Sequence, residues 1–254
     1  MKERLLNWLA CPLCGGALTL RSARGRDGEI VDGSLGCDRC DHAWPILRGI
    51  PRLLPPGMGC ETSATAARFA YEWSRYDEIR PEYEAQFRGW ISPFDPAGFA
   101  GRVVLDAGCG KGRHLRLAAR FGARDVVGLD VGASVDVSAR NTSDLGAVHL
   151  VQGDLARPPL RPGAFDVVYS IGVLHHLGDP AAGFRALAPL LVPGGVLLAW
   201  VYAREGNEAL LSALGPVRRM TRRSPPGLVR VLAWPPAALI HAAVRAVYRP
   251  ARSR

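Results

Sequence analysis

Two features are missing from this sequence, and each absence excludes a class of protein. The 254 residues contain no continuous apolar run of about 20 residues, the length that a membrane-spanning helix needs, so no such helix is expected. The N-terminus has a basic start and a short apolar stretch that leads directly into Cys11 and Cys14, which does not match a secretory signal peptide. We therefore expect a protein of the reducing cytoplasm.

Acidic residues are also missing from one end of the chain. None follows Glu208, and the segment from Arg204 to Arg254 contains ten arginines but only two glutamates. This stretch carries a net charge of +8, almost all of the +9 of the whole chain. Such a tail favours an anionic partner: a nucleic acid, a membrane surface or an acidic substrate. The alternative is a solvated basic surface without a partner.

Four of the six cysteines form two closely spaced Cys-x-x-Cys pairs, Cys11 with Cys14 and Cys37 with Cys40. Two such pairs supply four thiolates for a tetrahedral site, which suits zinc. Short apolar segments between the pairs, residues 17–20 and 29–31, predict strands as in a zinc ribbon. Because four thiolates fill the site, we expect a structural metal. A redox pair or buried free thiols are the alternatives, and His42 is a spare candidate ligand.

The second cysteine pair is followed by a Pro-Ile, Gly-Ile-Pro and Leu-Leu pattern that ends at Leu54. Over about residues 8–55, this segment resembles the small zinc-ribbon proteins that activate tRNA and protein methyltransferases. A Pro- and Gly-rich run at residues 55–59 predicts a linker. Cys60 lies outside both pairs and is given no role.

The most informative motif is an apolar strand that ends in Asp106 and continues with Gly108, Gly110 and Gly112. Glycines at such a turn let a ligand approach the backbone, and the following helix offers free N–H groups. Strands are predicted at residues 102–105, 125–129, 147–152, 165–170 and 196–202, mostly with helices between them. This alternation predicts a parallel sheet with helices on both faces.

Three acidic residues follow predicted strands at intervals of 24 residues: Asp106, Asp130 and Asp154. Ligands of such sheets bind at the carboxyl ends of the strands. A carboxylate after the second strand can accept hydrogen bonds from both ribose hydroxyls, and one after the third can accept from an adenine amino group. Each acid alone is equally compatible with a helix cap or a loop, but their common register favours one nucleotide site.

A dinucleotide-binding site is the main rival. Its Gly-x-Gly-x-x-Gly pattern fails here, because Arg113 stands at the last glycine position. Asp106 would also repel a pyrophosphate, whereas it suits a cationic amino-acid group. A ligand with adenine, ribose and such a group is S-adenosylmethionine.

With these motifs in order, residues 66–203 resemble the class I S-adenosylmethionine-dependent methyltransferases, particularly those related to quinone biosynthesis. Further matching motifs are Phe-Asp-Val-Val-Tyr-Ser at 165–170, Leu-His-His-Leu at 174–177 and Leu-Val-Pro-Gly-Gly at 191–195. The resemblance implies the fold, the cofactor and a site for it. It assigns the methionine end to Asp106, Gly108 and Gly110, the ribose to Asp130 and Val131, the adenine to Asp154 and Leu155, the methyl group to Ser170 and Ile171, and an aromatic lid to Tyr71 and Trp73.

Methyl transfer needs a base only when the acceptor keeps its proton. His175 and His176 follow the fourth predicted strand, near the expected transfer point. In the family such a pair is usually structural or lines the substrate, and His175 is the candidate base here. Tyr202 and Glu205 are candidates for an acceptor pocket, and Tyr169 is either a pocket or a core residue.

The tail departs from the family pattern, because residues 206–254 predict no terminal pair of strands. Helical segments are predicted at 208–214, 227–234 and 237–248, with a break at Pro235 and Pro236. Basic amphipathic helices of this kind suit an anionic membrane face, or they cover an exposed sheet edge. A third interpretation is that the chain has lost its terminal hairpin and works poorly alone.

The expected architecture is α/β, a Rossmann-like, mostly parallel sheet behind a small zinc ribbon. We predict a zinc-ribbon domain at 1–57, a helical extension at 58–101, an S-adenosylmethionine-binding domain at 102–203 and a basic helical tail at 204–254. The favoured function is methyl transfer to a small or amphiphilic metabolite, and we expect the tail to make a peripheral contact at the inner membrane face. A ribosomal-RNA methyltransferase is the second hypothesis, because a fused zinc ribbon also resembles a bacterial rRNA guanine methyltransferase. The third is a non-catalytic activator or scaffold that docks a protein partner.

Overall fold

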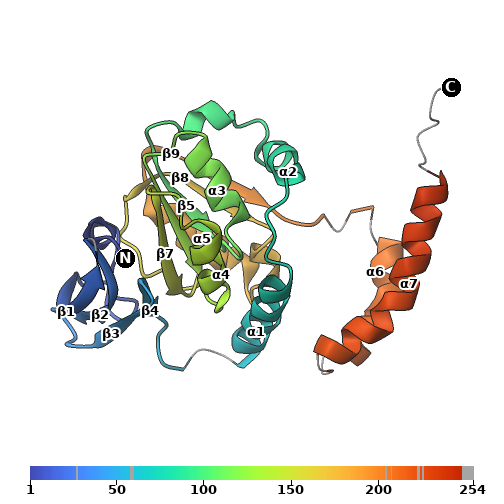
Figure 1. Ribbon diagram of the computed structural model, residues 1–254, viewed down its shortest axis with the longest axis horizontal. Coiled ribbons are helices and arrows are strands. Elements are labelled where there is room, and N and C mark those ends of the chain that lie inside the picture. Colours follow the sequence, from blue (N-terminus) through green and yellow to red (C-terminus); the bar gives the residue numbers. More distant parts are fainter. Residues whose placement is uncertain are drawn as a thin grey trace. The chain divides into compact units, whose positions relative to one another are not determined.

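The structure, a computed structural model, describes the chain apart from residues 27, 58–59, 204, 207, 222–223, 225 and 248–254. It divides into two units, Met1–Tyr202 and Ala203–Arg254 (Figure 1). The four-part division that the sequence suggests stays a prediction, and each unit is described by itself below.

A single nine-stranded sheet runs through the first unit, in the order β1-β2-β3-β4-β7-β6-β5-β8-β9. The predicted α/β class with a mostly parallel central sheet is confirmed, since β4, β7, β6, β5, β8 and β9 pair in parallel. The last strand begins about five residues earlier than expected, and the other bounds agree closely. The parallel strands are β5 (Val103–Ala107), β6 (Asp125–Asp130), β7 (Val148–Gly153), β8 (Phe165–Ile171) and β9 (Leu191–Trp200).

Strand β5 is buried on both faces, as all five of its residues are buried. Side chains alternate across a strand, so Leu105 joins one hydrophobic cluster and Val104 the other. Helices follow the strands as expected of a doubly covered sheet. They are α1 (Cys60–Arg75), α2 (Glu82–Ile91), α3 (Arg113–Arg120), α4 (Ser134–Asn141) and α5 (Pro180–Leu187), with short 3₁₀ turns η1 (Glu3–Asn7), η2 (Pro96–Phe99), η3 (Leu174–His176) and η4 (Ala188–Leu190).

The N-terminal segment contributes four strands, where the sequence predicts only two short ones. The last of them pairs in parallel with β7, through Arg52 opposite Gln152 and Leu53 opposite Gly153. Pro45 and Pro51 lie in β3 and β4, and proline weakens the local signal for a strand. The strands are β1 (Leu18–Arg26), β2 (Glu29–Cys37), β3 (Ala43–Leu47) and β4 (Ile50–Leu53).

The N-terminal segment also shares a core with the central sheet. Trp8 and Leu9 belong to the same buried cluster as Leu105. The backbone N–H of Ala10 donates to Pro159 at 3.0 Å, and that of Arg161 donates to Trp8 at 2.8 Å. The zinc-ribbon part is therefore packed and hydrogen-bonded against the sheet as one unit.

The second unit contains α6 (Glu208–Thr221) and α7 (Pro226–Val247). The predicted break at Pro235 and Pro236 is wrong, because α7 runs through both prolines. Proline has a backbone φ close to the helical value, so its cost in a helix comes from the lost N–H and steric crowding. That cost does not interrupt this helix. Tyr248 and several of the tail arginines lie outside the described residues.

The expectation of no helix that could span a membrane is also wrong. Among the described residues, Gly227–Ala246 is long and apolar enough to do so, with a mean hydropathy of 1.4 and no part of its apolar window buried. Arg230 and Arg245 interrupt its apolar sequence, and for that reason a search for an unbroken run misses it.

Candidate functional site

The four paired cysteines meet at one point. The sulfur atoms of Cys11, Cys14, Cys37 and Cys40 all lie within 4.8 Å of one another. Two of the sulfur pairs lie 3.7 Å apart (Cys11 and Cys40) and 3.4 Å apart (Cys14 and Cys37). A tetrahedral zinc site with zinc–sulfur bonds of about 2.3 Å needs sulfurs about 3.8 Å apart. The donor set therefore fits structural zinc.

The surroundings favour the thiolate at Cys37, whereas desolvation and the neighbouring thiols raise the pKa of Cys14 and Cys40. Although desolvation raises the pKa of Cys37, backbone N–H groups of Arg39 and Cys40 lower it to a net value of about 7. A Cβ at Gly16 would lie 3.0 Å from the Cys37 sulfur, so glycine leaves room for the cluster. The His42 ring packs on Trp44 at 4.3 Å and is not part of the set.

The glycine turn after β5 is crowded as well as left-handed. Gly108, Gly110 and Gly112 have φ values of 98°, 52° and 83°. A Cβ at Gly108 would lie 2.4 Å from Val173, and one at Gly110 would lie 3.0 Å from the Trp73 indole nitrogen. Glycine is therefore required here by space and by backbone conformation.

Asp106 is buried at the end of β5, with only 1% of its surface exposed. Its Oδ2 has no hydrogen-bond partner among the described residues. Burial, helped by the negative charge of Asp130, raises the pKa of Asp106 to about 8. A buried carboxylate oxygen without a partner is costly unless a ligand supplies a donor or a positive charge. The cationic amino group of S-adenosylmethionine fits this requirement.

Asp130, at the end of β6, joins two loops. Its Oδ2 accepts from the Gly110 N–H at 2.8 Å, and its Oδ1 accepts from the Gly132 N–H at 2.8 Å and the Ser134 hydroxyl at 3.0 Å. Burial raises its pKa, and these hydrogen bonds act in the opposite direction. The carboxylate thereby fixes the glycine turn against the loop that precedes α4.

The sheet register brings Asp154, Leu155 and Ser170 to the same edge as Asp130. Asp130 lies opposite Gln152, so Asp154 and the buried Leu155 follow at the end of the neighbouring strand. The hydroxyl of Ser170, fully buried, donates to the Ala107 carbonyl at 2.8 Å. Tyr71 is 41% exposed. The ligand roles of these residues stay predictions.

Lys111 is a site residue that the sequence reasoning missed. Its ammonium group is buried and donates to the carbonyls of Tyr76 and Glu78, at 2.7 and 2.9 Å, and to the Tyr83 hydroxyl at 3.2 Å. It also lies 5.2 Å from the centre of the Trp73 ring. Lys111 thus fastens the segment between α1 and α2 to the glycine turn. One signal was available, because the chain has only two lysines among 32 basic residues.

Aromatic rings form a continuous series from α1 to the end of β9. The His175 and His176 rings lie 4.1 Å apart, Phe69 packs on His176 at 4.9 Å, and Tyr202 packs on His175 at 4.8 Å. Tyr202 continues to Trp200 at 5.0 Å. Tyr169, in contrast, is fully buried against Phe87 and is a core residue.

Comparison with known families gives two matches along the chain. Residues 2–49 match the family described as Trm112p-like protein, and residues 105–199 match the family described as methyltransferase domain. Both resemblances found in the sequence are thereby confirmed.

Curated relatives cover part of the chain. The ubiquinone biosynthesis O-methyltransferase of Pectobacterium carotovorum subsp. carotovorum is 34% identical over 158 residues, which is 59% of this chain and 65% of that protein. The protein of the same name from Psychrobacter arcticus is 38% identical over 125 residues, or 46% and 48% of the two chains. The match thus spans less than two thirds of the length of either relative.

Among solved structures, an S-adenosylmethionine dependent methyltransferase from Mesorhizobium loti is similar, with 30% identity and a TM-score of 0.41. The similar region covers 45% of this chain and 52% of that one.

Proposed function

We propose that this chain, in which a Trm112p-like domain precedes a methyltransferase domain, transfers methyl groups from S-adenosylmethionine to a small or amphiphilic metabolite. The observation that carries the proposal is the pair of carboxylates at one sheet edge. Asp106 is buried and its Oδ2 has no partner among the described residues, and Asp130 is held by three donors beside the glycine turn. Asp106 suits a cationic group, and Asp130 suits neighbouring hydroxyls.

The cofactor would bind along this edge. Asp106, Gly108 and Gly110 would hold the methionine end, and Asp130 with Val131 would hold the ribose. The adenine would lie between Asp154 and Leu155, with Tyr71 and Ser170 near the methyl-bearing sulfur.

Bound S-adenosylmethionine supplies a methyl group on a sulfonium. When an acceptor attacks this methyl group in line, the sulfur leaves as a neutral thioether. The protein therefore contributes chiefly proximity and orientation. When the acceptor carries a proton, a base must remove it. His175 is the candidate, because its ring lies in the aromatic series beside His176 and Tyr202.

The aromatic series favours a flat, partly apolar acceptor, because aromatic side chains bind such molecules through ring contacts and apolar surface. The two relatives named above are ubiquinone biosynthesis O-methyltransferases, which agrees with an acceptor of this kind. The atom that receives the methyl group is left open.

One experiment separates the candidate functions. The protein is incubated with methyl-labelled S-adenosylmethionine and cell extract, and the label is followed into organic-soluble, RNA and protein fractions. Label in organic-soluble material supports the proposal. Label in RNA would favour the ribosomal-RNA alternative, for which the ten arginines of the tail offer phosphate contacts. Absence of label with a copurifying protein partner would favour a scaffold.

The raised pKa of Asp106 predicts a pH-dependent affinity. At about pH 7 the free protein holds a proton on this carboxyl, since its pKa is about 8, and binding of an ammonium group requires the carboxylate. The free protein thus binds more protons than the complex, so affinity for S-adenosylmethionine is expected to rise from about pH 6 to pH 8, by up to about tenfold per unit. Calorimetry in two buffers with different ionisation enthalpies measures the released proton. Asp106→Asn is expected to remove this dependence, and a pH-independent wild type would contradict the assignment.

We further propose that the protein is a cytoplasmic enzyme and that its residues 204–254 contact the inner face of the membrane. The exposed side chains of Leu232, Trp234 and Leu239 in α7 give apolar surface, and the tail arginines complement anionic lipid. An amphiphilic acceptor dissolved in that membrane would then lie near the enzyme.

Flotation of the full chain with vesicles tests this contact. Vesicles with about one third phosphatidylglycerol are expected to carry the protein upward, and purely zwitterionic vesicles less so. The double variant Leu232→Asp, Leu239→Asp is expected to stay at the bottom. Equal flotation of variant and wild type would remove the membrane contact.

A further inference from the structure

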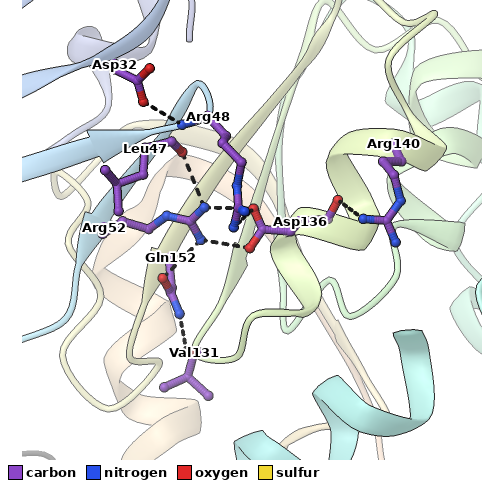
Figure 2. A network of polar contacts seen from close by, with 8 residues as sticks. All are labelled: Asp32, Leu47, Arg48, Arg52, Val131, Asp136, Arg140 and Gln152. Carbon is purple, nitrogen blue, oxygen red and sulfur yellow. Dashed lines mark hydrogen bonds and ion pairs between the residues drawn. The ribbon is translucent and has the colours of Figure 1, made fainter. Parts of the chain in front are cut away.

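One arginine of the zinc-ribbon part contacts α4 and β7, the two elements beside the loop that follows Asp130. Arg52 lies on β4, and only 11% of its side chain is exposed. Its Nη1 and Nη2 donate to the two carboxylate oxygens of Asp136 at 3.3 and 2.8 Å, and Nη1 also donates to Oε1 of Gln152 at 3.1 Å. Figure 2 shows the guanidinium between these two side chains.

Nη2 of Arg52 also donates to the Leu47 carbonyl at 3.3 Å, and its other two partners, Asp136 and Gln152, lead to the same loop. Asp136 lies in the first turn of α4, two residues after Ser134, whose hydroxyl donates to Asp130. Gln152 donates through Nε2 to the Val131 carbonyl at 3.0 Å (Figure 2). One guanidinium therefore supports the loop of residues 130–134 from both of its ends.

A second arginine provides a natural comparison. Arg48 also lies 3.0 Å from Asp136, but its side chain is 74% exposed. An exposed ion pair contributes little, because solvent screens it and both side chains lose freedom. The bidentate, mostly buried Arg52 fixes a geometry, and its removal leaves the half-buried Asp136 and Gln152 without their main partner.

We propose that Arg52 is a positioning residue through which the zinc-ribbon part orders the ribose-binding loop of residues 130–134. The proposal rests on the function proposed above and names a determinant of its cofactor affinity. Because a site binds more tightly when its groups are already in place, the ordered loop is expected to raise affinity for S-adenosylmethionine. The Trm112p-like segment then acts on the cofactor site of its own chain.

The test compares Arg52→Ala with Arg48→Ala in the full, zinc-loaded chain. Calorimetry measures affinity for S-adenosylmethionine. Hydrogen exchange measures how fast the backbone amides of residues 131–134 exchange in the absence of ligand. For Arg52→Ala we expect about tenfold weaker binding and faster exchange, with one zinc retained. Arg52→Lys is expected to be intermediate, because an ammonium group cannot make the paired contact. Arg48→Ala is expected to stay within about twofold of wild type.

The design separates this proposal from the function on which it rests. If wild type binds no S-adenosylmethionine, the proposed function fails, yet faster exchange in Arg52→Ala still supports the positioning role. If zinc-loaded Arg52→Ala protein shows the same hydrogen exchange and the same affinity for S-adenosylmethionine as wild type, the positioning role is overturned. If Arg52→Ala does not fold, Gln152→Leu removes the contacts of Gln152 with Arg52 and Val131 but keeps the ion pair of Arg52 with Asp136, and it is expected to weaken binding about threefold. Unchanged exchange and affinity in Gln152→Leu would then overturn it.

Discussion

Replacement of Asp130 by alanine is expected to weaken binding of S-adenosylmethionine by about 100-fold or more. The proposed role of this carboxylate is to accept from two ribose hydroxyls, and a hydrogen bond to a charged group contributes about 1.5–3 kcal/mol. Two such bonds correspond to at least about 3 kcal/mol, or about 100-fold in the dissociation constant. Titration calorimetry of wild type and Asp130→Ala measures the difference.

Asp130 also supports the loops, so a control must separate binding from local order. Ser134→Ala removes one of the three hydrogen bonds to Asp130 and keeps the carboxylate. It is expected to weaken binding by no more than about fivefold. A folded Asp130→Ala protein that binds as tightly as wild type would refute the assignment of the ribose site.

Substitution of Cys37 by alanine is expected to lower the zinc content from one per chain to none and to unfold the N-terminal strands. Binding of structural zinc contributes about 10–16 kcal/mol in small zinc domains, which is as large as the whole stability of many folded domains. Because β4 pairs with β7, the loss is expected to lower the melting temperature of the rest of the first unit by about 5 °C or more.

Metal analysis, hydrogen exchange in β1 to β4 and thermal unfolding measure these effects. Cys109→Ala is the matched control, because Cys109 lies in the glycine turn outside the cluster and its loss should leave zinc in place. If the wild-type protein keeps full protection of β1 to β4 from hydrogen exchange after a chelator has removed its metal, a structural role for the metal is contradicted.

The local patterns predict most of the first unit. Strand and helix periodicity between residues 102 and 200 gives the parallel sheet, and the spacing of the cysteines gives the zinc cluster. The acids after the strands give the carboxylates that the sheet register brings to one edge. These features depend on residues close together in the sequence, or on the general rule that parallel strands end at one edge.

The long-range contacts are what the sequence does not predict. Arg52 and Asp136 are 84 residues apart, and no local pattern marks either of them as a partner of the other. The carbonyl partners of Lys111 lie more than 30 residues before it. The continuity of α7 is not predicted for another reason. Two prolines such as Pro235 and Pro236 normally end a helix, and here they do not.

The pairing of β4 with β7 has a consequence for the order of folding. Arg52 and Gln152 are 100 residues apart, and both α1 and β5 lie between them in the chain. During synthesis the zinc-ribbon part can close its local, metal-linked contacts long before β7 leaves the ribosome, whereas the edge of β4 stays unpaired. An unpaired edge is a site of aggregation, and contacts of such long range form slowly. We expect an early zinc-ribbon intermediate that waits for the central sheet, and pulse-labelled hydrogen exchange during refolding would detect it as early protection of β1 to β3.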